Sequence, residues 1–228
     1  MRVLAIDTAL EACAAAVLDT VRGEIVSRES KPMARGHAEA LMPLVKRVME
    51  RSGYSFSDLN RIAVTVGPGS FTGLRVGIAA ARGLALASGK PAVGLSTLAV
   101  FAASLVAEDD TSPVVALVDA RHEHVYMQVL GPRGRTLVTP RLANLRDALR
   151  ASTTSRAPRL VGNAAAWLAA NWPARERRAA SVDQRAAPEI DWVAKLGAAA
   201  PGDAGPPRPL YLRAPDAQPQ DAAQIARR

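Results

Sequence analysis

The feature that most constrains the fold is a strand, a glycine-rich turn and a helix start in immediate succession. Residues 62–66 form an apolar run with the β-branched content of a buried strand. Gly67-Pro68-Gly69 interrupts this run, and Ser70 or Thr72 can cap a helix that continues to about Ser88. Free backbone N–H groups and the positive end of a helix dipole therefore meet at one spot, which suits an anion such as a nucleotide phosphate.

The spacing of this turn departs from the common phosphate-binding loops. Thr72 occupies the third glycine position of a G-x-G-x-x-G motif, and no lysine follows Gly73 as the G-x-x-x-x-G-K-[ST] loop requires. The alternative is a turn whose glycines only allow tight geometry. Both interpretations stay open for the loop residues Gly67, Pro68, Gly69, Ser70, Phe71, Thr72 and Gly73.

The predicted helix carries a ridge of small residues on one face. They recur every four positions, at Gly73, Gly77, Ala81 and Ala85. A ridge without side chains lets another helix approach closely. Leu74 and Ile78 lie on the opposite side and suit a sheet, while Arg75 flanks the ridge. The ridge predicts either packing inside the domain or pairing with a helix of another subunit.

Composition bounds the class of protein. The chain has 228 residues, enough for one large or two small domains, with 49% hydrophobic and 22% charged residues, as in a soluble globular protein. Cys13 is the single cysteine, which excludes an intramolecular disulfide and favours a reducing compartment. No signal peptide is visible, and the longest uncharged run, 91–107, falls short of a membrane span. We expect a cytoplasmic protein with no membrane partner.

The chain is strongly basic. Its formal net charge is +8, and most of the positive residues are arginines scattered along the sequence. A balance of this size permits contact with nucleic acid. An RNA-binding face and an ordinary solvated surface both fit the pattern.

A repeated unit predicts two related lobes. A strand at 2–6 ends in Asp7 and is followed by a second strand at 12–18, and a strand at 114–118 ends in Asp119 and is followed by another at 124–130. Both intervening turns lack glycine. We therefore predict a first lobe over 1–107, a second lobe over 113–213 whose last segment can pack on the first, and a mobile tail over 214–228.

The remaining segments complete an α/β pattern. A helix at 36–51 carries the stripe Leu41, Val45 and Val48 on one face. Further strands are predicted at 24–28 and 91–95, further helices at 96–106, 144–151, 164–171 and 190–200, a polar segment at 172–185, and a short ordered element at 210–213.

Five segments together resemble one family. They are LAIDTA at 4–9, GPGSFTGLRVG at 67–77, GLSTL at 94–98, DAR at 119–121 with Val125-Tyr126, and YLR at 211–213. The chain resembles the bacterial TsaB (YeaZ) family, the smaller partner of TsaD in threonylcarbamoyladenosine (t6A) synthesis on tRNA. The resemblance implies the actin-like ATPase and sugar-kinase (ASKHA) fold, with two related lobes that each hold a mixed sheet flanked by helices.

The resemblance also implies that the chain has no catalytic residue and no metal site. The catalytic relative TsaD binds a metal through two histidines, spaced H-x-x-x-H, on the helix after the strand that matches 91–95. The corresponding helix here begins with Ser96-Thr97-Leu98-Ala99-Val100-Phe101 and has no histidine. His122 and His124 have no convergent third ligand, and a metal site needs three or four. Asp7, Arg75 and Asp119 are the weaker candidates for contact with a nucleotide.

By resemblance, the chain is a structural and regulatory subunit, not an enzyme by itself. The complex transfers threonylcarbamoyl to N6 of adenosine 37 in ANN-decoding tRNAs. The chain would bind TsaD through helices 36–51 and 72–88, form a homodimer when alone, and work with the ATPase TsaE and the upstream enzyme TsaC. It would bind no cofactor tightly alone, with ATP or ADP at the junction. The implied partner interface comprises Leu41, Val45, Val48, Gly73, Gly77, Ala81 and Ala85.

Two other functions stay open. An independent ATP-dependent phosphotransferase of this fold needs glycine-bearing phosphate hairpins in both lobes, and both hairpins here lack glycine. A tRNA-binding module would use the arginine excess, and its affinity would fall steeply with salt.

Overall fold

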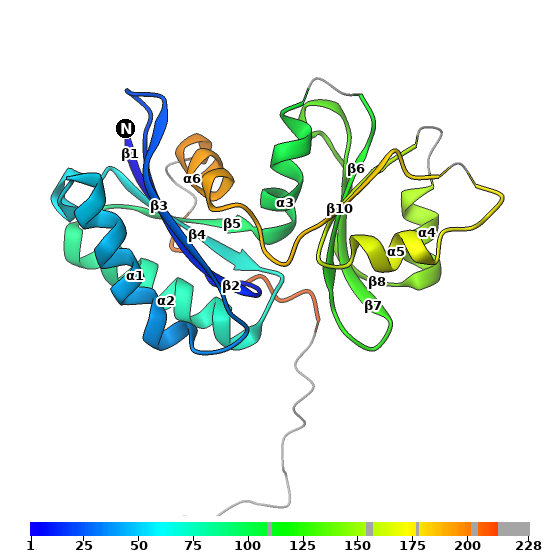
Figure 1. The fold of residues 1–228 in the computed structure, drawn as a ribbon, viewed down its shortest axis with the longest axis horizontal. Helices are drawn as coiled ribbons and strands as arrows, with labels where there is room; N and C mark the ends of the chain where they lie inside the picture. Colours follow the sequence, from blue (N-terminus) through cyan, green and yellow to red (C-terminus); the bar gives the residue numbers. More distant parts are fainter. Residues whose placement is uncertain (109–110, 154–156, 177, 202–204, 214–228) are drawn as a thin grey trace, which may run out of the picture.

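The computed structural model describes residues 1–213 except 109–110, 154–156, 177 and 202–204. The tail predicted at 214–228 lies outside the described residues. Two lobes lie side by side, each built on a five-stranded mixed sheet (Figure 1). Helices flank both sheets, so each lobe has the layered α/β architecture that the sequence predicts.

The first sheet has the order β3-β2-β1-β4-β5. β1 is antiparallel to β2 and parallel to β4, which is parallel to β5. β1 and β2 are almost entirely apolar and buried because helices cover both faces of this sheet. The strands are β1 (Arg2–Asp7), β2 (Ala12–Asp19), β3 (Glu24–Pro32), β4 (Arg61–Gly67) and β5 (Ala92–Ser96).

Three helices cover the first sheet. The helices α1 (His37–Ser52) and α2 (Phe71–Ser88) lie side by side on one face, and α6 (Ile190–Ala199) covers the other (Figure 1). α6 comes from near the end of the chain, yet it packs on the first sheet. The sequence left open that the last segment of the predicted second lobe at 113–213 packs on the first lobe, and α6 does so.

A buried arginine fastens α6 to the first sheet. Arg61 on β4 donates from Nη1 to the carbonyl oxygens of Gly197, at 2.8 Å, and of Ala200, at 2.5 Å. The last carbonyls of a helix have no partner within the helix, so the guanidinium supplies them with donors. Gly197 permits the close approach, because a Cβ there would lie 2.3 Å from that of Ala63.

The second sheet repeats the first. Its order is β8-β7-β6-β9-β10, with β6 antiparallel to β7 and parallel to β9. The shared order and directions confirm the predicted duplication and define the actin-like (ASKHA) fold. The strands are β6 (Val114–Asp119), β7 (His124–Leu130), β8 (Thr136–Asn144), β9 (Arg159–Gly162) and β10 (Ser181–Gln184).

The remaining helices complete the second lobe and join it to the first. α3 (Thr97–Val106) lies between the lobes and packs on β6, while α4 (Leu145–Ser152) and α5 (Ala165–Ala170) pack on the same lobe (Figure 1). Short 3-10 turns occur at Phe56–Asp58 and Pro132–Gly134. Among the described residues, no helix is long and apolar enough to cross a membrane.

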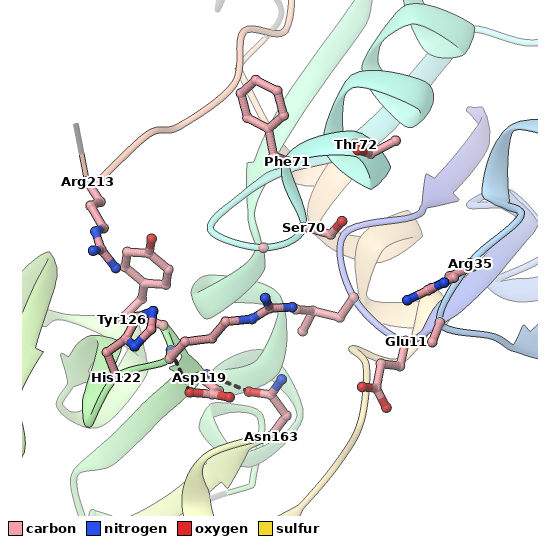
Figure 2. Close-up of a pocket in the computed structure, with 15 residues that line it drawn as sticks. Glu11, Arg35, Ser70, Phe71, Thr72, Asp119, His122, Tyr126, Asn163 and Arg213 are labelled. Carbon is pink, nitrogen blue, oxygen red and sulfur yellow. Dashed lines mark hydrogen bonds between the residues drawn. The ribbon is translucent and has the colours of Figure 1, made fainter. Parts of the chain in front are cut away.

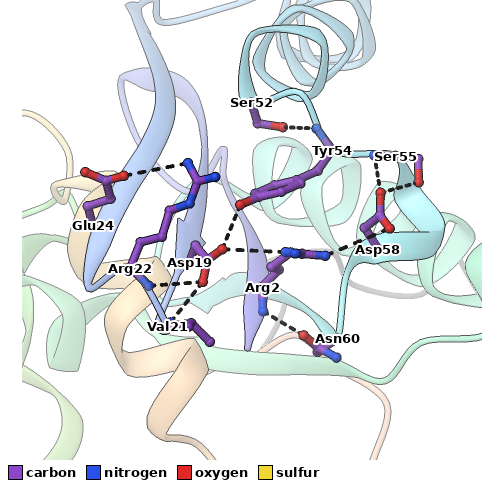
Figure 3. A network of polar contacts seen from close by, with 10 residues as sticks. All are labelled: Arg2, Asp19, Val21, Arg22, Glu24, Ser52, Tyr54, Ser55, Asp58 and Asn60. Atoms are coloured by element: carbon purple, nitrogen blue, oxygen red, sulfur yellow. Dashed lines mark hydrogen bonds and ion pairs between the residues drawn. The ribbon is translucent and has the colours of Figure 1, made fainter.

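A polar network closes the end of the first lobe opposite Asp7 (Figure 3). Asp19 accepts hydrogen bonds from the Tyr54 hydroxyl at 2.7 Å and from the Val21 N–H at 2.9 Å, and it pairs with Arg2 at 3.5 Å. The hydrogen bond from Tyr54 is the main cause that lowers the pKa of Asp19 to about 2. Arg2 also stacks over the Tyr54 ring at 4.2 Å.

Candidate functional site

The glycine-rich loop is built against the first hairpin. β4 ends at Gly67 and α2 begins at Phe71. The Ser70 N–H donates to the Ala9 carbonyl at 2.7 Å, and the Ser70 hydroxyl accepts from the Gly73 N–H at 3.3 Å. Ser70 is therefore the N-cap of α2. The loop and the hairpin form one hydrogen-bonded unit.

The glycines of the loop allow this close approach. A Cβ at Gly69 would lie 2.3 Å from the Ala9 carbonyl oxygen, and one at Gly73 would lie 2.1 Å from the Thr8 carbonyl oxygen. The Thr8 hydroxyl also donates to the Gly73 carbonyl at 2.8 Å. Tight geometry alone is enough to explain these two glycines.

The ridge of small residues faces the first sheet. Gly73, Gly77, Ala81 and Ala85 are buried. A Cβ at Gly77 would lie 2.4 Å from the Thr8 hydroxyl oxygen and 3.5 Å from Val64 Cγ2. The predicted partner interface was therefore wrong in these residues, because the small side chains let α2 approach its own sheet. Leu41, Val45 and Val48 of α1 are likewise buried in the core.

A different set of residues on the same helices faces outward. Leu86 is 86% exposed, Met42 is 46% exposed, and Gly83 has no neighbouring atom within 4 Å of a Cβ placed there. Ala79 and Ala87 are exposed too. We call this set the outer α1–α2 face: Met42, Ala79, Gly83, Leu86 and Ala87. These residues are apolar or small and lie on two neighbouring helices, with the exposed Arg82 among those of α2.

A cavity of about 680 Å³ separates the lobes (Figure 2). Glu11, Arg35 and the start of α2 line it from the first lobe, and Asn163 and the β6–β7 turn line it from the second. Of the loop residues, those that line it are Gly69, Ser70, Phe71 and Thr72. Gly67 lies elsewhere, with the Leu210 carbonyl oxygen 3.0 Å from a Cβ placed there. We call this space the interlobe cavity.

The turn between β6 and β7 shapes the second-lobe wall of the interlobe cavity. Arg121, His122 and Glu123 all have positive φ, between 50° and 62°. Such a run of non-glycine residues is uncommon and is held here by hydrogen bonds. The Arg121 N–H donates to Asp119 Oδ1 at 2.8 Å, and the Asp119 N–H donates to Asn163 Oδ1 at 2.8 Å (Figure 2). Asp119, a weaker candidate for nucleotide contact, thus lines the interlobe cavity.

Asp7 does not reach the interlobe cavity. It is fully buried, and its Oδ1 accepts hydrogen bonds from the Thr65 hydroxyl and from the Ala9 N–H. Its Oδ2 has no hydrogen-bond partner. Burial raises the pKa of this carboxyl group above its ordinary value. The hairpin and α2 therefore seal Asp7, a weaker candidate for nucleotide contact, in the core.

This burial predicts a pH-dependent effect of Asp7→Asn on stability. Because the native pKa is raised, native Asp7 holds its proton while the unfolded chain releases it, and its contribution to stability falls as pH rises above about 4. Asparagine cannot ionise, so we expect the stability of the variant to increase relative to that of the wild type as pH rises. Thermal unfolding from pH 4 to 8 measures this, with 1 kcal/mol appearing as about 2–4 °C in Tm.

Asp19→Asn is the matched control. The pKa of Asp19 is lowered to about 2, so its ionised form stabilises the native state above about pH 4. Asp19→Asn should be less stable than the wild type at neutral pH. This difference in stability between the two proteins should shrink as pH falls through 2. A Tm difference of Asp7→Asn that stays constant with pH would contradict the burial of an ionisable Asp7.

A cluster of aromatic rings and one arginine lies at the mouth of the interlobe cavity. The rings of Phe71 and Tyr211 stack with centroids 5.8 Å apart, and the Arg75 guanidinium lies 3.7 Å from the Phe71 ring centroid. The Leu210 N–H donates to the Val66 carbonyl at 2.8 Å, which places the YLR segment beside the loop. We call Phe71, Arg75 and Tyr211 the aromatic cluster. Arg75 therefore contacts a ring, outside the cavity.

Several lining residues were missed by sequence reasoning. Arg35, Arg121, Asn163 and Arg213 all line the interlobe cavity. They come from segments far apart in the chain, and no spacing in the sequence links them. Among the described residues, no group of three or more His, Cys, Asp or Glu side chains could hold a metal ion.

Comparisons with known proteins agree on one family. The model of TsaD, described as tRNA N6-adenosine threonylcarbamoyltransferase, matches residues 24–164. The tRNA threonylcarbamoyladenosine biosynthesis protein TsaB of Escherichia coli (strain K12) is 40% identical over 126 residues, which are 55% of this chain and 53% of that protein. The chain thus spans about half the length of the curated relatives it matches.

Two solved structures from Pseudomonas aeruginosa match nearly the whole chain. One, described as an uncharacterized protein with similarity to peptidase YEAZ, has a TM-score of 0.79 at 28% identity and covers 93% of this chain and 99% of its own. The other, YeaZ, has a TM-score of 0.75 at 27% identity and covers 92% and 99%.

The fold and site together define a two-lobed actin-like protein. Its Asp7, the acidic residue at the end of the first strand, is sealed in the core. Its two hairpins lack the glycines that admit phosphates in the kinases of this fold. With the matches above, the chain belongs to the TsaD-related family of tRNA threonylcarbamoyladenosine biosynthesis proteins, within its TsaB (YeaZ) branch.

Proposed function

We propose that the chain is a non-catalytic structural and regulatory subunit in t6A biosynthesis. It would bind TsaD in the complex that transfers threonylcarbamoyl to N6 of adenosine 37 in ANN-decoding tRNAs. The observation that carries this proposal is the 40% identity to TsaB of Escherichia coli together with the family model over residues 24–164. TsaE and TsaC would act in the same pathway.

One feature of the site supports a non-catalytic role. Phosphoryl transfer depends on groups that position phosphates and their metal ions. Asp7 is the residue at the end of the first strand that would take part, and it is fully buried behind Thr65 and Ala9. An independent phosphotransferase is therefore the weaker alternative, and ATP or ADP is assigned to a junction between subunits.

The outer α1–α2 face is the proposed partner surface. Leu86 and Met42 are large apolar side chains that remain exposed, and Gly83 leaves open space beside them. Exposed apolar side chains gathered on neighbouring elements are typical of a protein interface. Small residues at Ala79, Gly83 and Ala87 would let a partner helix approach closely. The same face would join two copies of the chain when TsaD is absent.

Light scattering after gel filtration tests the proposal. We expect the chain alone to elute as a dimer and to form a stable one-to-one or two-to-two complex when mixed with TsaD from the same organism. The measurement is repeated with and without ATP to determine whether formation of the complex requires a nucleotide. If no association occurs under either condition, the partner-subunit function is wrong and the phosphotransferase and tRNA-binding alternatives return.

A further inference from the structure

The positive charge of the chain is concentrated in one part of the second lobe. Residues 131–153 contain five arginines and a single acidic residue, Asp147, so this short segment carries +4 of the formal net charge of +8. All five arginines are exposed, and they are Arg133, Arg135, Arg141, Arg146 and Arg150. Half of the net charge thus lies within a segment of 23 residues in a chain of 228.

These arginines do not stabilise the fold through ion pairs. None of the five pairs with a carboxylate of another described residue. Four exposed arginines of the first lobe, by contrast, each pair with a carboxylate, and they are Arg22, Arg28, Arg47 and Arg51. The guanidinium donors of residues 131–153 therefore remain available to an anion from outside the chain.

Three of the five arginines share one surface of the second lobe. Arg141 lies on β8, at the edge of the second sheet, and lines a groove of about 340 Å³ together with Arg150 of α4. Arg146 lies four residues before Arg150 and hence on the same side of α4. The buried Ala148 and Ser152 lie on the side of α4 that packs on the sheet. We call Arg141, Arg146 and Arg150 the arginine surface.

The arginine surface is separate from the sites described above. α4 lies on the side of the second lobe that faces away from the first lobe (Figure 1). None of the three arginines lines the interlobe cavity or belongs to the outer α1–α2 face. A large partner can therefore reach this surface without entering the cavity.

Local structural roles explain only part of this charge. Arg150 lies in the last turn of α4, where the helix dipole favours a cation. Arg141 and Pro140 discourage another strand from pairing with the edge strand β8. Arg146 has neither role, since it is the second residue of α4, where the dipole disfavours a cation. Its presence there favours a function other than stability.

The chemistry of the arginine surface fits the phosphate backbone of RNA. A guanidinium group can bind a phosphate through two parallel hydrogen bonds, and it stays charged at physiological pH. Arg135 lies just before β8 and extends the positive charge along the sheet edge by roughly 20 Å beyond Arg141, at about 3.3 Å per residue. A surface of this length can meet several phosphates, because phosphates are closely spaced along a nucleic-acid strand.

A membrane or a protein partner fits this surface less well. Interfaces of both kinds usually add large exposed apolar side chains to their cations. Among the described residues of 131–153, Leu137 is the single large apolar side chain that is exposed. The surface is therefore almost purely electrostatic, as expected where a protein contacts a phosphate backbone.

We propose that the arginine surface binds the phosphate backbone of the substrate tRNA. The proposal rests on the proposed function in tRNA modification, which makes a tRNA the RNA that the chain would meet. Phosphate contacts fix the position and orientation of a nucleic acid without reading its sequence. The second lobe would thus hold the body of the tRNA, while TsaD acts on adenosine 37.

Fluorescence anisotropy of the full chain with a labelled, unmodified transcript of an ANN-decoding tRNA tests the proposal. The titration is repeated between about 50 and 200 mM NaCl, and we expect saturable binding that weakens steeply as salt rises. A variant that combines Arg141→Gln, Arg146→Gln and Arg150→Gln should bind at least tenfold more weakly at about 100 mM NaCl. Its slope of log affinity against log salt should be shallower by about 2–3, because each phosphate contact contributes about 0.7–0.9.

Two further variants serve as controls. Arg22→Gln, Arg28→Gln and Arg51→Gln combined make the same charge change on exposed first-lobe arginines and should change the affinity by no more than about twofold. Replacing the three residues of the arginine surface by lysine keeps the charge and should retain most of the affinity and the full salt slope. Circular dichroism verifies that each variant is folded.

Three outcomes would overturn the proposal. One is the absence of saturable tRNA binding at about 50 mM NaCl. Another is an equal loss in the two glutamine variants, because net charge alone would then explain the binding. The third is binding to vesicles of phosphatidylcholine and phosphatidylserine in place of tRNA, which would assign the surface to a membrane.

The test is separate from that of the partner-subunit function. The glutamine variant of the arginine surface should still bind TsaD, and Gly83→Leu, on the outer α1–α2 face, should still bind tRNA. A failed TsaD interaction and a failed RNA surface therefore give different results.

Discussion

Gly77→Leu is expected to destabilise the first lobe strongly. A Cβ at this position would lie 2.4 Å from the Thr8 hydroxyl oxygen, in space that the first sheet already fills. Overpacking costs about 1–3 kcal/mol and sometimes more. Displacing Thr8 also breaks its hydrogen bond to the Gly73 carbonyl, which costs a further 1–3 kcal/mol, approximately. A loss of about 4 kcal/mol should lower Tm by roughly 8–16 °C, as measured by circular dichroism.

Gly83→Leu is the matched control for this stability measurement. It makes the same substitution on the same helix, six residues further on, where a Cβ meets no atom within 4 Å. Leucine is a better helix former than glycine by about 0.5–1 kcal/mol, so Tm should stay level or rise slightly. If Gly77→Leu and Gly83→Leu have the same Tm, then Gly77 does not face the sheet and the ridge is free for a partner.

The sequence predicts the first lobe well because its signals are local. The apolar β-branched run before Gly67 gives β4, Ser70 caps α2, and the acid at the end of each first strand marks the repeated unit. Each of these patterns is read within a few residues. The strand order of both sheets then follows from the duplication, which the sequence carries as two strands ending in Asp7 and Asp119.

The second lobe was harder to predict because three of its strands are short or atypical. β9 and β10 have four residues each, and β8 contains Pro140, which weakens a strand signal. β10 lies in the segment that was predicted to be polar, and no element was predicted at β9 or over most of β8. β8 pairs with β7, β9 pairs with β6, and β10 pairs with β9. Pairing between distant segments is not visible in a local pattern.

The ridge was misread for a different reason. A stripe of small residues permits another element to pack closely against the helix, but it does not identify that element. The stripe comprises Gly73, Gly77, Ala81 and Ala85. The sequence therefore could not tell a sheet of the same lobe from a helix of a partner. The interlobe cavity was missed because residues such as Arg35 and Asn163 meet only after both lobes have folded.

Gly83→Leu is also expected to abolish TsaD binding while the chain stays folded. The substitution adds a branched side chain at the open site between Ala79 and Ala87, where a partner helix would need close contact. A clash at the centre of an interface costs about 3 kcal/mol, or roughly a hundredfold in Kd. Calorimetry or surface plasmon resonance with TsaD measures the loss, and circular dichroism confirms the fold.

Val21→Leu is the control for added apolar bulk. Val21 is an exposed residue beside the polar network of the first lobe and is not part of the outer α1–α2 face (Figure 3). The Val21→Leu variant should bind TsaD with the affinity of the wild type. The same comparison applies to self-association, because the proposed dimer uses the same face and Gly83→Leu should elute as a monomer. If a folded Gly83→Leu variant still binds TsaD with full affinity, the proposed partner surface on these two helices is wrong.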